Sequence, residues 1–300
     1  MPSIDLEPTF GKIRPNALQW NPLIVIRHGI CSSRDPFVPL ATYLETEFPN
    51  AEVDNQSYAW RDSVLLNGAR LANHIRNKTS GRPLVLIGHS MGGLLCRVAN
   101  VILCDAVGFL HQVSTSAADL TYKEKDLRDI EGLSFDKGTM PVPNLLVTLA
   151  TPNSGAMLEG QVSGIPYLLK TAFHLFPPTN IQSVADLTSS RLFRFLQNFS
   201  VGTPTLSISG SKGNRFARGS GQIATWSGKR GLRIEMPNDL IVEDRSVDLN
   251  NSILPSEIVQ HGKSPYEHVR CYLNCIDVWH SSIYDNLTVK DILVDCLKRC

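Results

Sequence analysis

Three short runs of apolar residues, each bounded by turn residues, predict buried strands of a parallel sheet. The runs are Leu23 to Arg27, Leu84 to Ile87 and Leu145 to Ala150. Because a parallel strand is usually covered on both faces, its sequence is apolar throughout and does not alternate. Thr203 to Ser209 has the same character further along the chain, and Ala51 to Val53 is a weaker strand with a candidate continuation at Ser57 to Trp60.

Apolar residues recur at helical spacing between these runs. One helix face ends at the break Ser80 to Pro83 and consists of Val64, Leu65, Ala69, Leu71, Ala72 and Ile75. A second helix is predicted to start at Gly92 and to run through Ile102. Strands that alternate with helices in this way predict an α/β fold with a doubly wound, mostly parallel central sheet.

The pattern changes to helices alone from Gly155 to about Asn198. The first helical face consists of Ile165, Leu168, Leu169, Ala172, Phe173 and Phe176, and a second helix is predicted from Val184, Leu187, Leu192, Phe193 and Leu196. A helical insertion in an α/β chain is commonly a cap over the ligand edge of the sheet, so residues 155–200 are interpreted as a cap within a single domain of residues 1–300. The alternative is that these are ordinary core helices. The last helix is predicted from Val289 to Leu297, with Thr288 and Asp291 as its capping box.

Composition excludes several classes of partner. Of 300 residues, 42% are apolar, and 29 Lys and Arg stand against 28 Asp and Glu, which gives a net charge of +1. Nucleic acid and anionic membranes attract a one-signed basic surface, which this chain lacks. No apolar stretch reaches the roughly 18 residues of a membrane helix, and Asp5 and Glu7 stand where a secretory signal would be apolar. A cytoplasmic location is therefore expected, with transient membrane-surface contact and signal-independent secretion left open.

The seven cysteines form no Cys-x-x-Cys pair, so the sequence predicts neither a zinc site nor a redox site. Cys271 with Cys275 and Cys296 with Cys300 are spaced four residues apart, and one disulfide between the two pairs is an alternative. Reduced, buried thiols are the expectation.

The segment from Leu84 to Leu94 contains Gly-x-Ser-x-Gly, with Ser90 at its centre. An apolar strand precedes the motif and a helix follows it, as a nucleophile elbow requires. Such a turn holds the serine in a strained conformation above the sheet and directs the helix N-terminus at developing negative charge. Gly88 and Gly92 are expected because a Cβ at either position would collide with the neighbouring chain.

A His-Gly pair, His28 and Gly29, ends the first strand. The sharp bend that glycine permits would turn the next amide into the site, so the N–H groups of Ile30 and Met91 are expected to form an oxyanion hole. We expect His28 to be structural rather than the general base, and His89 to point away from the nucleophile.

These blocks, together with Leu149 to Gly155, resemble the lipase and serine-esterase branch of the α/β-hydrolase superfamily. The chain is similar to bacterial triacylglycerol lipases and to proteins of the GPI inositol-deacylase group. It departs from the family pattern at Asn153, where many relatives have His after Thr-Pro, but that position is usually structural.

The resemblance implies that an acid and then a histidine follow the nucleophile. Asp239, in a segment like the family's Asn-Asp-Gly-x-Val loop but with Leu240 in place of glycine, is the predicted acid, with Asp244 and Asp248 as alternatives. Three histidines follow, and His280 is the predicted base because it lies after an apolar segment and before the last helix; His268 is its rival and His261 the third.

The sequence therefore predicts a serine hydrolase of carboxylic esters that works through an acyl-enzyme, without metal or organic cofactor. Leu168, Leu169, Phe173 and Phe176 indicate an acyl-chain substrate such as a glyceride or phospholipid, although a packed cap would show the same stripe. Acyl transfer and thioester cleavage are alternatives that use the same residues, as is an inactive binding module. The oligomeric state is not predicted.

Overall fold

A computed structural model describes residues 12–14, 20–30, 32–116, 124–133, 140–153, 182–188, 190–197, 199, 203–210, 270–275, 278 and 280–300. The centre of the fold is a six-stranded sheet in the order β2-β1-β3-β4-β5-β6, in which every neighbouring pair is parallel. The strands are β1 (Leu23–Arg27), β2 (Glu52–Asn55), β3 (Leu84–His89), β4 (Leu145–Leu149), β5 (Thr205–Gly210) and β6 (Arg270–Cys275). All residues of β1, β3 and β4 are buried, which explains their unbroken apolar runs.

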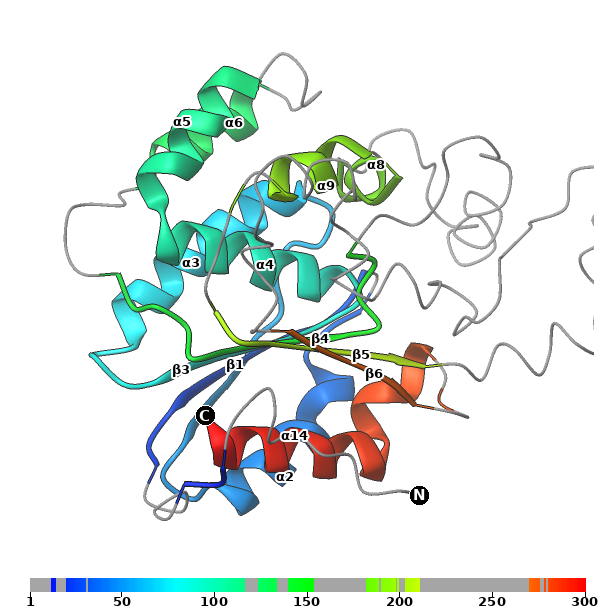
Figure 1. The fold of residues 1–300 in the computed structure, drawn as a ribbon. Coiled ribbons are helices and arrows are strands. Elements are labelled where there is room, and N and C mark those ends of the chain that lie inside the picture. Colours follow the sequence, from blue (N-terminus) through cyan, green and yellow to red (C-terminus); the bar gives the residue numbers. More distant parts are fainter. Residues whose placement is uncertain are drawn as a thin grey trace, which may run out of the picture.

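Helices cover both faces of this sheet (Figure 1). One face carries α3 (Val64–Lys78) and α4 (Met91–Cys104), with α5 (Ala106–Ser116), α6 (Glu124–Glu131), α8 (Gln182–Thr188) and α9 (Ser190–Gln197) outside them. The other face carries α2 (Val38–Glu47) and α14 (Leu287–Arg299), together with the short 3-10 helices η2 (Asp35–Phe37) and η4 (His280–Asp285). The predicted doubly wound architecture is confirmed.

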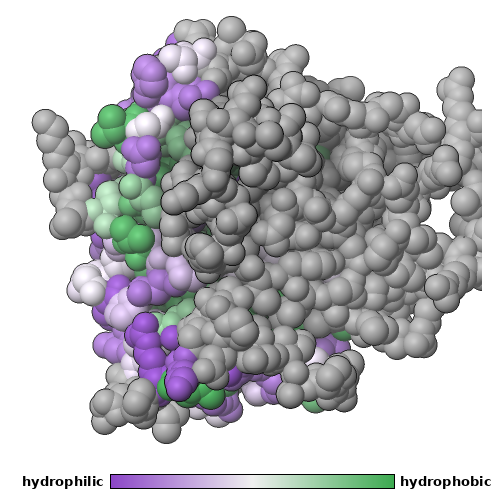
Figure 2. All heavy atoms as spheres, viewed as in Figure 1, coloured by the Kyte–Doolittle hydropathy of each residue, from purple (hydrophilic) through white to green (hydrophobic). Residues whose placement is uncertain are grey.

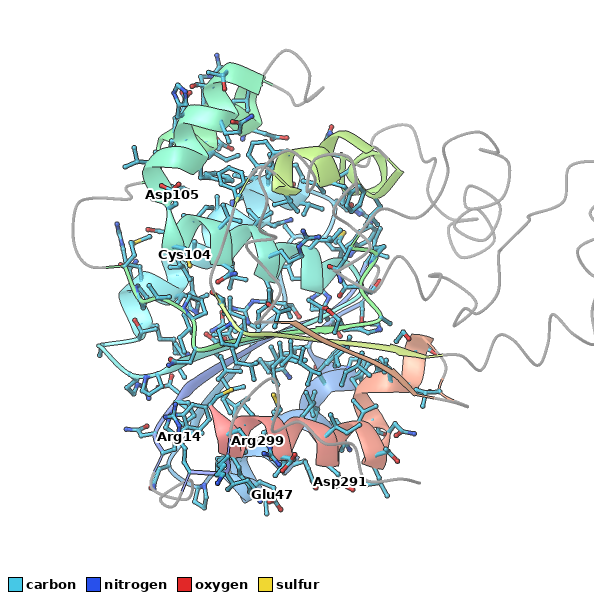
Figure 3. All side chains as sticks on the ribbon, viewed as in Figure 1. Arg14, Glu47, Cys104, Asp105, Asp291 and Arg299 are labelled. Carbon is cyan, nitrogen blue, oxygen red and sulfur yellow. The ribbon has the colours of Figure 1, made fainter. Side chains whose placement is uncertain are left out.

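Each face of the sheet has its own hydrophobic core. Leu23, Val25, Leu84 and Leu86 face α3 and α4, whereas their neighbours along the strands, such as Ile24, face α2 and α14. The outer side of the α2–α14 layer is polar: Figure 3 shows Glu47 and Asp291 there, and hydrophilic residues predominate at the corresponding end of the surface in Figure 2. Tyr43 of α2 donates a hydrogen bond to Asp291 of α14 at 2.9 Å.

Several element boundaries differ from the sequence predictions. The last helix begins at Leu287, because the side chain of Asn286 caps it by accepting a hydrogen bond from the Val289 N–H at 3.2 Å. The predicted capping box of Thr288 and Asp291 is therefore wrong, and Asp291 bonds Tyr43 instead. The stretch 57–60 is not a strand, and β2 ends at Asn55.

The described part of the predicted cap consists of two short helices rather than one. Both pack on the α3–α4 layer, and the buried apolar side chains that join this core are Leu187, Leu192, Phe193, Phe195, Leu196 and Phe199. The buried carboxylate of Asp186 accepts a hydrogen bond from the Val64 N–H at 2.7 Å and so attaches α8 to the first turn of α3. The interpretation of residues 155–200 as a cap stays a prediction, because residues 154–181 lie outside the described part of the chain.

In the described part of the chain, no single helix has the length and hydropathy to cross a membrane. Only α4 and α5 taken together pass that test, and the pair is bent by 113°.

The cysteines with described side chains are Cys96, Cys104, Cys296 and Cys300, and none of these four forms a disulfide. The expectation of reduced thiols is confirmed for them. Neither Cys296 nor Cys300 therefore takes part in the alternative disulfide.

Candidate active site

Ser90 lies on the turn between β3 and α4, at the carboxyl edge of the sheet. Its backbone has φ 52° and ψ −125°, a conformation that side chains other than glycine rarely adopt. Such strained residues persist only where the surroundings hold them, and they concentrate at functional sites. The predicted strained turn is confirmed.

Glycines on either side of Ser90 let three segments of backbone come together. A Cβ on Gly88 would overlap Gly93, and a Cβ on Gly92 would overlap the carbonyl oxygens of Arg27 and His28 at the end of β1. The obstacles in both cases are backbone atoms, which cannot turn aside as a long side chain can. The expectation that these positions exclude a Cβ is confirmed.

The turn is also attached to the neighbouring strand β4. The N–H of Ser90 donates to the Leu149 carbonyl at 2.9 Å. Arg97 of α4 donates to the carbonyl of Asn153 at 2.9 Å, and the Asn153 side chain, which is buried, donates to Thr148 at 3.3 Å. Asn153 thus joins β4 to α4, and this agrees with a structural role for the position.

The loop after β1 packs directly on the nucleophile position. A Cβ on Gly29 would lie 3.0 Å from the Cβ of Ser90, so only glycine lets this loop approach so closely. Ile30 follows on the same loop. Met91 is the first residue of α4, and its N–H is one of the four amides that a helix cannot use internally. The two predicted oxyanion donors therefore flank the contact between Gly29 and Ser90.

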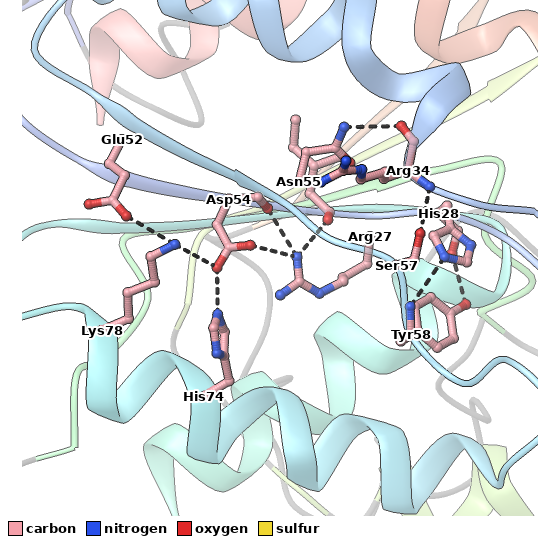
Figure 4. Close-up of polar contacts among 11 residues, drawn as sticks. Arg27, His28, Arg34, Glu52, Asp54, Asn55, Ser57, Tyr58, His74 and Lys78 are labelled. Atoms are coloured by element: carbon pink, nitrogen blue, oxygen red, sulfur yellow. Dashed lines mark hydrogen bonds and ion pairs between the residues drawn. The ribbon is translucent and has the colours of Figure 1, made fainter.

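His28 is held in the neutral form by contacts on both ring nitrogens. Figure 4 shows its contacts with Tyr58. Its Nδ1 lies 2.7 Å from the Gly29 carbonyl, which can only accept, so Nδ1 carries the proton; Nε2 then accepts the Tyr58 N–H at 3.4 Å. The Tyr58 hydroxyl donates to the His28 carbonyl at 2.8 Å, and the two rings stack at 4.4 Å. Burial lowers the pKa of His28. A buried neutral ring with both nitrogens engaged agrees with a structural role.

The bond from His28 also orients the predicted donor at Ile30. In a trans peptide the N–H points opposite to the carbonyl. Because the His28 ring holds the Gly29 carbonyl, the N–H of Ile30 is directed away from that ring. Tyr58 supports this arrangement, and the sequence analysis missed its role because the stretch was interpreted as a strand.

The His89 ring lies beside the loop after β1: a Cβ on Gly29 would come within 3.2 Å of its Nδ1. The ring also lies 5.6 Å from that of Phe37 and 5.3 Å from that of Tyr284, which belongs to η4. That His89 points away from the nucleophile stays a prediction.

The remaining predicted site residues are only partly within the described structure. His280 is the first residue of η4, but its side chain is outside the described set. The other candidates lie wholly outside the described residues: Asp239, Asp244, Asp248, His261, His268, Leu168, Leu169, Phe173 and Phe176. Among described side chains, no three His, Cys, Asp or Glu residues are grouped so that they could hold a metal ion.

Comparison with solved structures gives the class of fold. The mature form of Bacillus licheniformis lipase BlEst2 superposes with a TM-score of 0.51 at 19% identity, covering 91% of this chain and 92% of that one. The propeptide form of the same lipase gives a TM-score of 0.50 at 16% identity, with 91% of this chain covered and 50% of that one. The product of the lin2722 gene of Listeria innocua gives 0.48 at 11% identity, over 90% and 91% of the two chains. No protein-family model and no curated protein matches the sequence.

The chain therefore has the α/β-hydrolase fold. Its elbow at Ser90 occupies the strand-to-helix turn at which this fold carries its nucleophile.

Proposed function

We propose that this protein is a serine hydrolase that cleaves carboxylic esters through an acyl-enzyme. The observation that carries the proposal is the strained backbone of Ser90, between a buried parallel strand and a helix, with Gly29 packed against it. A turn built only for packing would not need a positive φ at a serine, since glycine adopts that conformation without strain.

In the first step, the Ser90 hydroxyl oxygen attacks the ester carbonyl carbon and passes its proton to His280. The amides of Ile30 and Met91 bind the negative oxygen of the tetrahedral intermediate. As the carbon–oxygen bond to the alcohol breaks, His280 returns the proton to the leaving group. Water then repeats the sequence on the acyl-enzyme and releases the acid. Asp239 is proposed to hold His280 in the required tautomer.

The position of η4 supports the choice of His280. This short helix follows β6, and its Tyr284 contacts His89, the residue before Ser90. The backbone of His280 therefore belongs to a segment that reaches the strand carrying the nucleophile.

Fluorophosphonate labelling tests the nucleophile. The parent protein is expected to form a covalent adduct, and Ser90→Ala is expected to keep its fold and lose the adduct. Ser114→Ala, which changes an exposed serine of α5, is the matched control and should label like the parent. Labelling of Ser90→Ala at the parent level would disprove the proposal.

A pair of histidine variants tests the general base. His280→Ala is expected to lower ester turnover at least about a thousandfold, whereas His268→Ala should have little effect. Activity should rise with pH through the ordinary histidine range near 6.5. An inactive His268 variant beside an active His280 variant would reverse the assignment and leave the esterase proposal intact.

The substrate class is proposed to be lipid-like. A panel of esters of increasing acyl length, with thioesters and alcohol acceptors included, separates lipase, thioesterase and acyltransferase activity. Higher kcat/KM for long acyl chains than for acetate esters is the expected result.

A further inference from the structure

A cluster of buried charges lies beside the oxyanion loop, at the carboxyl ends of β1 and β2 (Figure 4). Arg27, the last residue of β1, is 4% exposed, and Asp54 of β2 is 2% exposed. Their side chains form an ion pair with Nη1 and Oδ1 3.4 Å apart. Buried charges are costly and are retained where they are paired and hydrogen-bonded.

Asp54 is satisfied on both carboxylate oxygens. Besides Arg27 on Oδ1, its Oδ2 lies 2.6 Å from Nε2 of His74 and 3.1 Å from Nζ of Lys78, both on α3. Burial alone would raise the pKa of this carboxyl, but Arg27, His74 and Lys78 together hold it below its ordinary value. The carboxylate is therefore ionised and fully engaged.

Arg27, in contrast, uses only one end of its guanidinium. All of its hydrogen bonds come from Nη1, to the carbonyls of Ile26 and Asp54 and to the Asp54 carboxylate. Within the described part of the chain, Nε and Nη2 have no hydrogen-bond partner. These two groups form one edge of the planar fork, and that edge matches two oxygens of a carboxylate or phosphate. Through this edge, the buried Arg27 can donate two hydrogen bonds to an anion.

A pocket of about 230 Å³ lies at this position. Its walls are the end of β1, the loop after β2, one face of α3 and part of α4. Its lining includes Arg27, Tyr58, Asn67, Arg70, His74 and Leu95. Asn67, Arg70 and His74 follow one another at three and four residues along α3, so they share one face of that helix. The lining contains no acidic residue.

We propose that this pocket binds the phosphate group of a small soluble ligand. Arg27 supplies two parallel donors from the floor, and Arg70, whose Nη1 is paired with Asp62, adds its remaining donors from the α3 wall. Donors that converge from separate directions suit a tetrahedral dianion better than a planar carboxylate, which one arginine edge can satisfy. The volume is below the range of drug-sized ligand sites, which also favours a small ion or monoester.

The site is independent of the proposed esterase activity, because none of the donors belongs to the catalytic set. Tyr58 connects the two, since it lines the pocket and also contacts His28. Binding is therefore measured directly rather than through turnover.

Equilibrium dialysis of the full chain against radiolabelled inorganic phosphate tests the proposal. Saturable binding of one phosphate per chain is expected. Arg27→Lys keeps the charge but lacks the two-donor edge. Its affinity for phosphate should be about tenfold lower, because one hydrogen bond to a charged group is lost. A similar loss is expected in Arg70→Gln, which remains decisive if Arg27→Lys fails to fold.

Lys125→Gln is the matched control, because Lys125 is an exposed helical cation paired with a carboxylate, as Arg70 is, but outside the pocket. It should bind phosphate like the parent. Absence of saturable binding, or an equal loss in Lys125→Gln, would overturn the proposal. Equal displacement by acetate would overturn the choice of phosphate, and binding only to vesicles that carry phosphatidic acid would overturn a soluble ligand.

Discussion

The elbow at Ser90 and the charge cluster at Arg27 lie at neighbouring strand ends, yet they are held by opposite means. The elbow depends on missing side chains: Gly88 and Gly92 let backbone meet backbone, and Gly29 leaves room for the Cβ of Ser90. The charge cluster depends on long ionised side chains that neutralise one another in a buried setting. One region is fixed by shape and the other by electrostatics.

This difference determines how each region should respond to perturbation. A steric fit does not depend on pH, and an added methyl group is enough to disturb it. A buried ion pair tolerates small changes of volume but fails when one charge is removed, because its partner is left uncompensated. Four predictions use this contrast.

The largest effect is expected from Asp54→Asn. It leaves the buried Arg27 without its counter-charge, so the free energy of unfolding should fall by about 3–5 kcal/mol. Asp129→Asn removes an exposed pair with Lys125 and should leave the midpoint of the same urea titration almost unchanged. Similar losses in the two variants would contradict the electrostatic account.

The same carboxyl predicts a pH dependence. Because the pKa of Asp54 is lowered in the folded protein, its stabilisation is present above the ordinary value near 3.8 and is lost as the pH falls through and below it. Urea titrations between pH 7 and pH 3 should show this loss in the parent, with a shallower decline in Asp54→Asn.

The third prediction concerns shape. Gly92→Ala places a Cβ against two carbonyl oxygens and should destabilise the protein by about 3 kcal/mol, the upper end of ordinary overpacking. Gly81→Ala is the matched control: its φ is 77° but the space around it is open, so backbone strain alone should cost about 1–2 kcal/mol. The loss in Gly92→Ala should not change with pH, and equal stability of the two variants would refute the steric account.

The smallest effect is expected at Tyr58, which contacts both regions. Tyr58→Phe removes the hydrogen bond to the His28 carbonyl and loosens the loop that carries Ile30, so kcat on a labile ester should fall up to about tenfold with KM unchanged. Tyr43→Phe loses a comparable bond to Asp291 on the other face of the sheet and should leave kcat unchanged. A change in KM alone would argue against positioning of the oxyanion donor.

The sequence was sufficient to predict the elbow and the strands around it. The strands β1, β3 and β4 are mostly apolar along their buried length, and the glycine spacing around Ser90 has a direct steric cause. It was not sufficient for α2, whose Pro39 lies in the first turn, where proline is tolerated, although it resembles a helix break. The polar strand β6 was missed because it lacks an apolar run.

The charge cluster could not be predicted for a different reason. Asp54 stands in a short polar strand, and its partners Arg27 and Lys78 are 27 and 24 residues away. Local pattern does not show that such charges are buried together, since any one of them is usually solvated. The register of β1 beside β2 brings Arg27 to Asp54, and the packing of α3 on the sheet brings Lys78 there.

The packing of α14 on α2 has a consequence for synthesis on the ribosome. The apolar underside of β1, with Ile24 and Ile26, and the inner face of α2 are covered by Val289, Leu293 and Leu297, which are translated about 250 residues later. At roughly 5–20 residues per second, this surface remains uncovered for tens of seconds in the nascent chain. Such exposure favours aggregation and chaperone capture. The apolar face formed by β1 and α2 therefore cannot be buried until α14 has been translated.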